Sequence, residues 1–442
     1  MFRRVFVANR GEVAARVART CDRLGVTPVL AVSDPDADLA WLEGREVARV
    51  GGRGGYLDAN ALLEAARALR CSAVHPGWGF LSENAIFATR CANERLSFVG
   101  PSPDHMRAMG DKSVARDTMK RLGLAPIPGT DGTIPDAAAA AEVAASFGYP
   151  VLLKARSGGG GRGMRRVYRP EDLASAFAEA TAESESAFGD GALYLEKLIE
   201  GGRHVELQVL GDAHGNLTVL GERECSVQRR HQKLLEESPS PAVSPELRAR
   251  VFAQVATACR AVGYVNAGTV EMLLDREGNL WFMEMNTRLQ VEHPVTEMVT
   301  GLDLVELQLR VAANEVVIPA VVSSGHSIEC RVNAEDPALG FKPSPGRVTR
   351  LRLPEGDGVR CDTHLREGDA ISPHYDSMIA KIIVHAPTRD DAIARMESAL
   401  RATEIVGVPT TIGLHLRILA HPAFRSGQYD TTFLDRMLAE EA

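Results

Sequence analysis

The sequence predicts a multidomain α/β protein, and three observations support this class. The chain has 442 residues, enough for two to four domains. Its first 110 residues alternate strand-like and helical segments, which is the rhythm of an open parallel sheet. Hydrophobic residues make up 45% of the chain and charged residues 24%, as in an ordinary globular protein, so wholesale disorder is excluded.

The N-terminal segment has the clearest alternation. Strands are expected at 4–9, 26–32 and 72–77, with helices at 12–25 and 59–70. The first strand-to-helix turn, NRGEVA, has one glycine where a dinucleotide-binding fingerprint needs three. The segment therefore predicts a parallel α/β domain, and a dehydrogenase interpretation is weak.

A smaller unit and a set of long strands follow. After a helix and the Pro/Gly-rich link LAPIPGTDGTIP, the pattern predicts a helix at 136–148 and strands at 150–156 and 192–199. Long alternating strands are expected at 204–212 and 216–224, then a helix at 245–263. Residues 268–286 read as a hairpin that turns at 275–278, and the remainder mixes strands with helices.

Bulk properties exclude several classes. A net charge of −8 argues against a sequence-independent hold on nucleic acid, and no apolar run is long enough to span a bilayer. The start, MFRRVFVANRGEV, has no signal-peptide pattern. The seven cysteines are scattered and form no CxxC pair, so a reduced, cytoplasmic chain is expected.

Two carboxylates and an amide on the predicted hairpin suggest a metal site. Glu271 lies on the first strand, and Glu284 and Asn286 lie on the second, all within apolar surroundings. Oxygen ligands on paired strands can surround a hard divalent cation. The alternative, that both carboxylates face solvent, is weaker because an unpaired carboxylate among apolar residues is costly.

The stretch EMNTRLQVEHP continues this polar pattern. As an extended strand it would place a row of polar groups on one face, namely Glu284, Asn286, Arg288, Gln290 and Glu292. An isolated strand of this kind would be a solvated edge. Next to a predicted metal site, the row indicates a binding site for a charged ligand.

Two further motifs carry positive charge. The loop KARSGGGGRGMR places four glycines after Lys154, so that its backbone N–H groups can approach a phosphate; a flexible linker is the alternative. It is not a Walker A motif, because the lysine precedes the glycines. The cluster CSVQRRHQK, with Lys233, reads equally well as a solvated charge run when taken alone.

Together these pieces resemble the ATP-grasp superfamily and, within it, the biotin carboxylase family. The matching stretches lie between residues 8 and 381 and include ANRGEVAARV, HPGWGFLSEN, MGDK, GGGGRGM, RHVELQV, ERECSVQRRHQK, EMNTRLQVEHPVTE, ECRVNAEDP, PSPG and YDSMIAK. The resemblance implies three domains: a Rossmann-like domain over 1–110, an ATP-grasp domain over 111–320 with a mobile lid at about 130–202, and a mixed α/β domain over 321–442.

The resemblance also implies a reaction. ATP and bicarbonate would form carboxyphosphate, whose CO2 unit passes to a ureido nitrogen of biotin, with Mg2+ or Mn2+ as the metal. The implied metal ligands are Glu271, Glu284 and Asn286, and the implied catalytic residues are Arg288, Glu292, Lys233 and Arg331. Glu292 is the expected base toward bicarbonate, and Arg331 is expected to stabilise the biotin enolate.

The remaining roles follow from the same likeness. Contacts with ATP are implied for Lys112, Lys154, Gly160, Gly161, Met164, Glu196, Lys197, Leu198, His204, Gln228, His231 and Leu273. Contacts with bicarbonate or biotin are implied for Lys233, Arg288, Gln290, Val291, Arg331, Trp78 and Glu83. Asp376 is expected either to orient Arg331 or to form a structural pair with Lys381.

This sequence departs from the family pattern at one informative position. Trp78 stands where tyrosine is usual, and its indole can donate a hydrogen bond but not accept one, which bears on biotin affinity. No segment resembles the Ala-Met-Lys-Met biotin acceptor. Biotin is therefore expected on a separate carrier protein or on a carrier domain outside this sequence, with a carboxyltransferase as a further partner and a homodimer as the family's assembly.

Two other functions remain open on the sequence. One is a different ATP-grasp carboxylate ligase, which the QVEHPVTE and ECRVNAEDP stretches argue against. The other is a catalytically silent scaffold, which the presence of every implied catalytic residue argues against.

Overall fold

The N-terminal domain is a five-stranded parallel sheet, as its alternation predicts. The computed structural model describes residues 1–130, 132–157 and 163–440. The strand order is β3-β2-β1-β4-β5, and all four pairings are parallel. The strands are β1 (Arg4–Val7), β2 (Thr27–Val32), β3 (Glu46–Arg49), β4 (Ala73–His75) and β5 (Ser97–Phe98), and the helices are α1 (Gly11–Arg23), α2 (Ala59–Ala68) and α3 (Ala85–Asn93).

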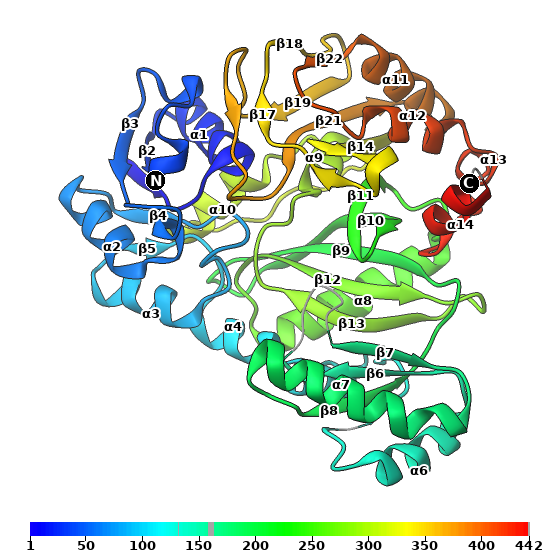
Figure 1. The fold of residues 1–442 in the computed structure, drawn as a ribbon. Helices are drawn as coiled ribbons and strands as arrows, with labels where there is room; N and C mark the ends of the chain where they lie inside the picture. The colour runs from blue at the N-terminus through cyan, green and yellow to red at the C-terminus, as the bar shows by residue number, and fades with distance from the viewer. Residues whose placement is uncertain (131, 158–162, 441–442) are drawn as a thin grey trace.

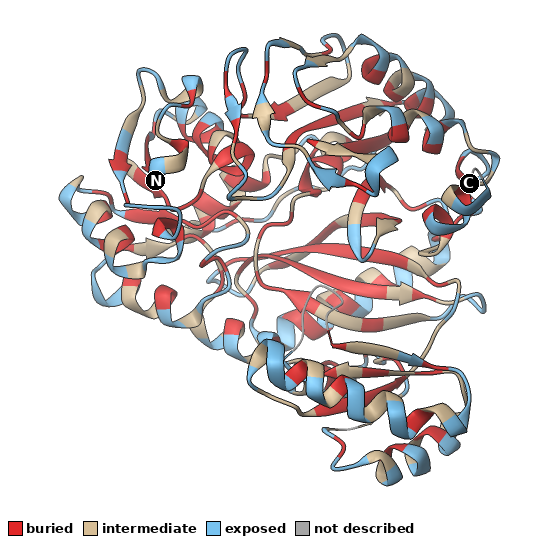
Figure 2. Cartoon of the chain, in the orientation of Figure 1, coloured by how far each residue is buried: buried red, intermediate tan, exposed pale blue. Residues whose placement is uncertain are grey.

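A small α/β unit projects from the rest of the molecule (Figure 1). Its antiparallel sheet has the order β7-β6-β8 and is packed against two helices. The elements are β6 (Val151–Ala155), β7 (Met164–Val167), β8 (Leu193–Lys197), α6 (Ala137–Phe147) and α7 (Leu173–Phe188). Figure 2 shows that the outer faces of both helices are exposed, while buried residues line the side that meets the sheet. Helices α4 (Pro103–Gly110) and α5 (Lys112–Arg121) precede this unit.

The centre of the molecule is one eight-stranded sheet with the order β13-β12-β9-β10-β11-β14-β21-β19. Its strands are β9 (Arg203–Gly211), β10 (Leu217–Arg229), β11 (Gln232–Ser238), β12 (Asn266–Leu274), β13 (Leu280–Asn286), β14 (His326–Asn333), β19 (Val359–Thr363) and β21 (Met378–Ala386). Because β11 pairs with β14, hydrogen bonding runs unbroken across the boundary proposed at 320/321. The predicted ATP-grasp range, 111–320, and the predicted C-terminal range, 321–442, therefore share a single sheet.

Helices cover this sheet, and short strands complete the C-terminal part. The helices are α8 (Pro245–Val262), α9 (His293–Thr300), α10 (Leu304–Ala312), α11 (Arg389–Ala402), α12 (Ile412–Ala420), α13 (Pro422–Arg425) and α14 (Phe433–Glu440). The short strands are β15 (Glu335–Asp336), β16 (Lys342–Pro343), β17 (Gly346–Arg347), β18 (Arg350–Arg352), β20 (Ala370–Ile371) and β22 (Glu404–Val406). Within the described residues, no helix has the length and apolarity needed to cross a membrane.

The predicted hairpin at 268–286 is confirmed, but the polar strand beyond it is not. Strands β12 and β13 pair antiparallel, with Glu271 directly opposite Glu284. Strand β13 ends at Asn286, residues 287–292 have no regular structure, and α9 begins at His293. Pro294 favours this helix start, because the fixed φ of proline suits the first helical turn. The period-two row therefore stops at Asn286.

Candidate active site

A cavity of about 760 Å³ is lined by residues from all three predicted domain ranges, 1–110, 111–320 and 321–442. It is bounded by the β10–β11 hairpin, the ends of β12 and β13, the 287–292 loop and the loop before β21. The predicted site residues that line it are Trp78, His204, His231, Lys233, Glu271, Glu284, Asn286, Arg288, Gln290, Val291, Glu292 and Arg331. Tertiary structure thus brings most of the polar row and the CSVQRRHQK lysine into one chamber.

Lys233 lies at the centre of a carboxylate cluster. Its Nζ contacts Glu206, lies 2.5 Å from Glu292 Oε1 and lies 3.2 Å from Glu271 Oε1. Burial disfavours its charge, but the three carboxylates outweigh burial and raise the pKa of Lys233 well above its ordinary value. Lys233 is therefore a cation inside the cavity, and the solvated-run alternative is wrong for this residue, whereas its neighbours Arg230 and His231 are exposed.

Glu292 bridges Lys233 to Arg331. Arg331 Nη2 donates to Glu292 Oε2 at 3.0 Å, and its Nε donates to Glu236 Oε1 at 2.6 Å. Burial opposes ionisation of Glu292, but the neighbouring cations Lys233 and Arg331 hold its pKa well below the usual range. Burial raises the pKa of Glu236 to about 7, against the lowering effect of Arg331. Glu292 is thus the ionised carboxylate at this point of the cavity.

The two carboxylates of the hairpin fit a hard divalent cation. Glu271 is buried, whereas the Glu284 side chain is 36% exposed and lies 3.4 Å from Lys112 Nζ. Burial opposes ionisation of Glu271, yet Lys233 and His204 lower its pKa below the usual value. Asn286 donates its Nδ2 to Glu271 at 2.8 Å. Directly opposed carboxylate oxygens of this kind are the ligands that Mg2+ prefers.

Arg288 and Gln290 are held by residues outside the predicted strand. Glu83, from the N-terminal domain, accepts from Arg288 Nε and from the Thr287 N–H, each at 2.9 Å. Gln290 donates to Glu271 at 2.7 Å and accepts from Arg223 Nη2 at 2.7 Å. The cavity-facing geometry of the 287–292 loop thus depends on side-chain contacts and not on strand alternation.

Three buried residues of the site were missing from the predicted set: Glu206, Arg223 and Glu236. Arg223 is fully buried and donates to Gln208, Glu206 and Gln290. Glu206 had a weak signal, because it shares a strand face with His204. Arg223 and Glu236 lie within charge-rich stretches that look solvated until β10 and β11 are placed inside a sheet.

The proposed nucleotide contacts form a second group around the small sheet. Lys154 and Arg116 both contact the buried carboxylate of Glu196. Met164 lies opposite Lys154 in the β6–β7 pair, and Lys112 lies beside Glu284. Gly160 and Gly161 lie outside the described residues.

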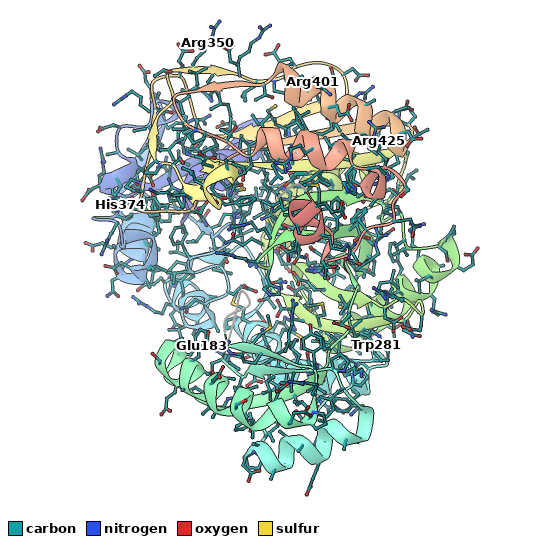
Figure 3. The ribbon with its side chains drawn as sticks, turned by 45° about the vertical axis from the view of Figure 1, so that its right-hand side comes forward. Glu183, Trp281, Arg350, His374, Arg401 and Arg425 are labelled. Atoms are coloured by element: carbon teal, nitrogen blue, oxygen red, sulfur yellow. The ribbon has the colours of Figure 1, made fainter. Side chains whose placement is uncertain are left out.

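Other members of that group lie on the large sheet or at the end of β8 in the small one. Gln228 Nε2 lies 2.7 Å from His204 Nδ1, and Leu273 pairs with His204 across β12 and β9. Lys197 donates to the carbonyls of Gly148 and Tyr149, each at 2.9 Å. Lys197 and Leu198 line a second cavity, of about 360 Å³, which is also lined by Trp281 of β13 (labelled in Figure 3).

Asp376 lines the cavity but takes neither of the two expected roles. Its carboxylate accepts from the Met378 N–H at 3.1 Å. Arg331 is held by Glu236 and Glu292 instead, because both carboxylates lie on elements adjacent to its own strand. Lys381 forms its ion pairs with other acidic residues, Glu12 and Asp362.

Three family models together match most of the chain. The biotin carboxylase N-terminal domain model matches residues 1–106, and the biotin carboxylase C-terminal domain model matches 329–436. The model for the carbamoyl-phosphate synthase L chain ATP-binding domain matches 111–318.

Similar proteins agree along their full lengths. Biotin carboxylase from Nostoc sp. is 46% identical over 443 residues and covers 99% of each chain, and biotin carboxylase 2 from Bacillus subtilis is 45% identical over 99% of this chain and 100% of its own. The biotin carboxylase–β,γ-ATP complex from Campylobacter jejuni superposes with a TM-score of 0.96 at 43% identity, covering 99% of each chain. This chain therefore belongs to the biotin carboxylase family, whose central domain has the ATP-grasp fold.

Proposed function

We propose that this protein catalyses the ATP-dependent carboxylation of biotin by bicarbonate. The observation that carries the proposal is the Lys233–Glu292–Arg331 bridge in one cavity with the Glu271/Glu284 pair. Phosphoryl transfer to bicarbonate needs charge neutralisation, an oriented nucleophile and a proton acceptor. This cluster contains a group for each need. The Hydrogenobacter thermophilus 2-oxoglutarate carboxylase domain, 45% identical, has been crystallised with MgADP and bicarbonate.

Bicarbonate would lie between Lys233, Arg288 and the 290–292 backbone. Lys233 and Arg288 supply fixed positive charge, and Glu292, already ionised, accepts the bicarbonate proton. The anion then attacks the γ-phosphorus of ATP, and ADP leaves. Carboxyphosphate then splits into CO2 and phosphate, the phosphate accepts the ureido N–H proton of biotin, and that nitrogen attacks CO2. Arg331 lines the cavity and would stabilise the biotin enolate, a role that suits a guanidinium because it stays protonated.

ATP would bind between the small and large sheets. Lys154 and Lys112 supply the phosphate-binding charge from β6 and the start of α5. Glu271 and Glu284 would hold Mg2+ or Mn2+, which neutralises phosphate charge when bound. Asn286 is proposed as the third ligand; to serve, its amide oxygen must turn from Arg288, which it contacts at 3.0 Å.

The domain limits and partners belong to the same proposal. We retain domains over 1–110, 111–320 and 321–442, with residues 130–202 acting as a lid that closes to exclude water. The biotin is proposed to arrive on a separate carrier protein that also serves a carboxyltransferase. A homodimer and a reducing, cytoplasmic setting are proposed too, the latter because all seven cysteines are free.

The test follows labelled bicarbonate. Purified protein with Mg2+ and ATP is assayed for hydrolysis with and without bicarbonate and biotin, and for label in acid-labile carboxybiotin. Biotin-stimulated turnover with fixed label supports the proposal. Bicarbonate-dependent hydrolysis without fixation, even with a carrier protein, would point to another acceptor and to a different ATP-grasp ligase. Turnover without any bicarbonate dependence would refute the proposal.

A further inference from the structure

The bicarbonate loop, residues 290–292, is held from outside its own domain. Strand β13 has ended before it, so the loop's buried carbonyls need partners other than a sheet ladder. The Gln290 carbonyl accepts from His293 Nδ1 at 2.8 Å. The Val291 carbonyl accepts from Lys381 Nζ at 2.8 Å. Since Val291 lines the cavity, its backbone position is set by a residue of β21.

Lys381 is a buried ammonium that contacts all three sequence segments. Its side chain is 0% exposed, and its Nζ lies 3.1 Å from Glu12 Oε1 on α1 and 3.9 Å from Asp362 Oδ2 on β19. Glu12 is itself buried, and neither of its carboxylate oxygens accepts another hydrogen bond from the described residues. Burial raises the pKa of Glu12. Burial also opposes ionisation of Asp362, but Arg360 and Lys381 outweigh it and hold the pKa of Asp362 well below its usual value. A charge at Lys381 is tolerated because the ionised Asp362 carboxylate lies nearby.

The same ammonium lies beneath the cavity wall. Lys381 Nζ is 4.9 Å from the centre of the Trp78 indole ring, and Trp78 lines the cavity. The His293 ring packs 6.1 Å from the same indole. Burial, with Lys381 next, lowers the pKa of His293 well below its usual value, so the imidazole is neutral and Nδ1–H remains the donor to Gln290. One cation therefore supports the loop backbone and the aromatic wall together.

We infer that Lys381 is a positioning residue for bicarbonate, acting through the Val291 carbonyl and the Trp78 ring. Its ammonium donates a hydrogen bond to the Val291 carbonyl, forms an ion pair with Glu12 and lies near the Trp78 ring. A lysine suits this point because its charge is compact, whereas a planar guanidinium needs more room. Without the ammonium, the Val291 carbonyl loses its side-chain donor. This inference rests on the proposed function.

The test separates positioning from folding. Lys381→Met removes the ammonium but leaves the buried Glu12 carboxyl without its ion-pair partner. The double variant Glu12→Gln/Lys381→Met therefore replaces both groups together. Glu12→Gln alone is the matched control, because it keeps the Lys381–Val291 contact. KM for bicarbonate, KM for ATP and kcat are measured for each variant beside its melting temperature.

We expect KM for bicarbonate to rise about tenfold to a hundredfold in both variants that lack Lys381. A change of this size corresponds to the loss of one charge-assisted hydrogen bond. KM for ATP should stay within about twofold of wild type, since Lys381 is absent from the proposed nucleotide contacts. The Glu12→Gln control should keep the wild-type KM for bicarbonate.

Two results would overturn the inference. A folded double variant with a wild-type KM for bicarbonate would show that Lys381 is only structural, and equal increases in both KM values would show a general disturbance. Wild-type protein without bicarbonate-dependent hydrolysis would instead overturn the proposed function, and this inference with it. The wild-type assay therefore tells the two failures apart.

Discussion

Replacing Glu292 by glutamine tests the proposed base most directly. The side chain is 2% exposed, with one oxygen 2.5 Å from Lys233 and the other 3.0 Å from Arg331. Glutamine keeps the volume and one acceptor but cannot take a proton. A positioned general base is worth about 10²- to 10⁴-fold, so bicarbonate-dependent ATP hydrolysis should fall by that factor.

The stability cost of this change should be much smaller. Lys233 keeps Glu206 and Glu271, and Arg331 keeps Glu236, so neither cation is left alone. We therefore expect a loss of about 1–2 kcal/mol in the free energy of unfolding, below the ~3–5 kcal/mol typical of an unpaired buried charge. Denaturant unfolding measures this loss beside the rate.

Glu329→Gln is the matched control for Glu292→Gln. Glu329 lies opposite Glu236 in the β11–β14 pair, is fully buried and lies outside the cavity lining. Burial, reinforced by the nearby carboxylates, raises the pKa of Glu329 well above its usual value, so the neutral form is favoured and an amide resembles it. Its rate should stay within about twofold of wild type. A Glu292→Gln protein that matched this control would refute the base assignment.

Three further predictions concern metal, biotin and pH. Glu284→Gln should raise the Mg2+ concentration needed for half-maximal ATP hydrolysis by about tenfold; an unchanged Mg2+ titration would exclude Glu284 as a ligand. Because Trp78 lines the cavity and is a proposed biotin contact, Trp78→Ala should raise KM for biotin more than KM for ATP; equal changes would contradict this. Burial opposes ionisation of Glu237, but His326 and Arg389 lower its pKa to about 2 from 4.5. The ionised Glu237 side chain should therefore contribute its full share of the unfolding free energy above pH 4.5. This contribution should vanish as the pH falls toward 2. Unfolding of Glu237→Gln and wild type at pH 7 and pH 3 checks this: the difference in unfolding free energy should shrink at pH 3, and a constant difference would contradict the assignment.

The fold class could be predicted because hydrophobic periodicity and turn residues are properties of short stretches of sequence. Strands 4–9, 26–32 and 72–77 alternate with helices, and the 268–286 hairpin has its turn between two apolar strands. These elements form where expected, since hydrophobic periodicity selects their geometry. The prediction of an extended strand is wrong beyond Asn286, because Pro294 and the start of α9 impose a different backbone. The last three members of the polar row, Arg288, Gln290 and Glu292, still line the cavity, because loop contacts that periodicity cannot express hold them there.

By itself the sequence determined the chemistry available: the carboxylate pair of the hairpin, the Lys233 cluster, the glycine loop and the likeness to biotin carboxylases. Only the tertiary structure decided how those groups are charged and held. Glu292 is ionised because Lys233 and Arg331 converge on it from β11 and β14, and the Val291 carbonyl is fixed because Lys381 reaches it from β21. Such contacts join residues 39 to 90 positions apart, and electrostatics depends on distance in space, which residue order alone does not contain.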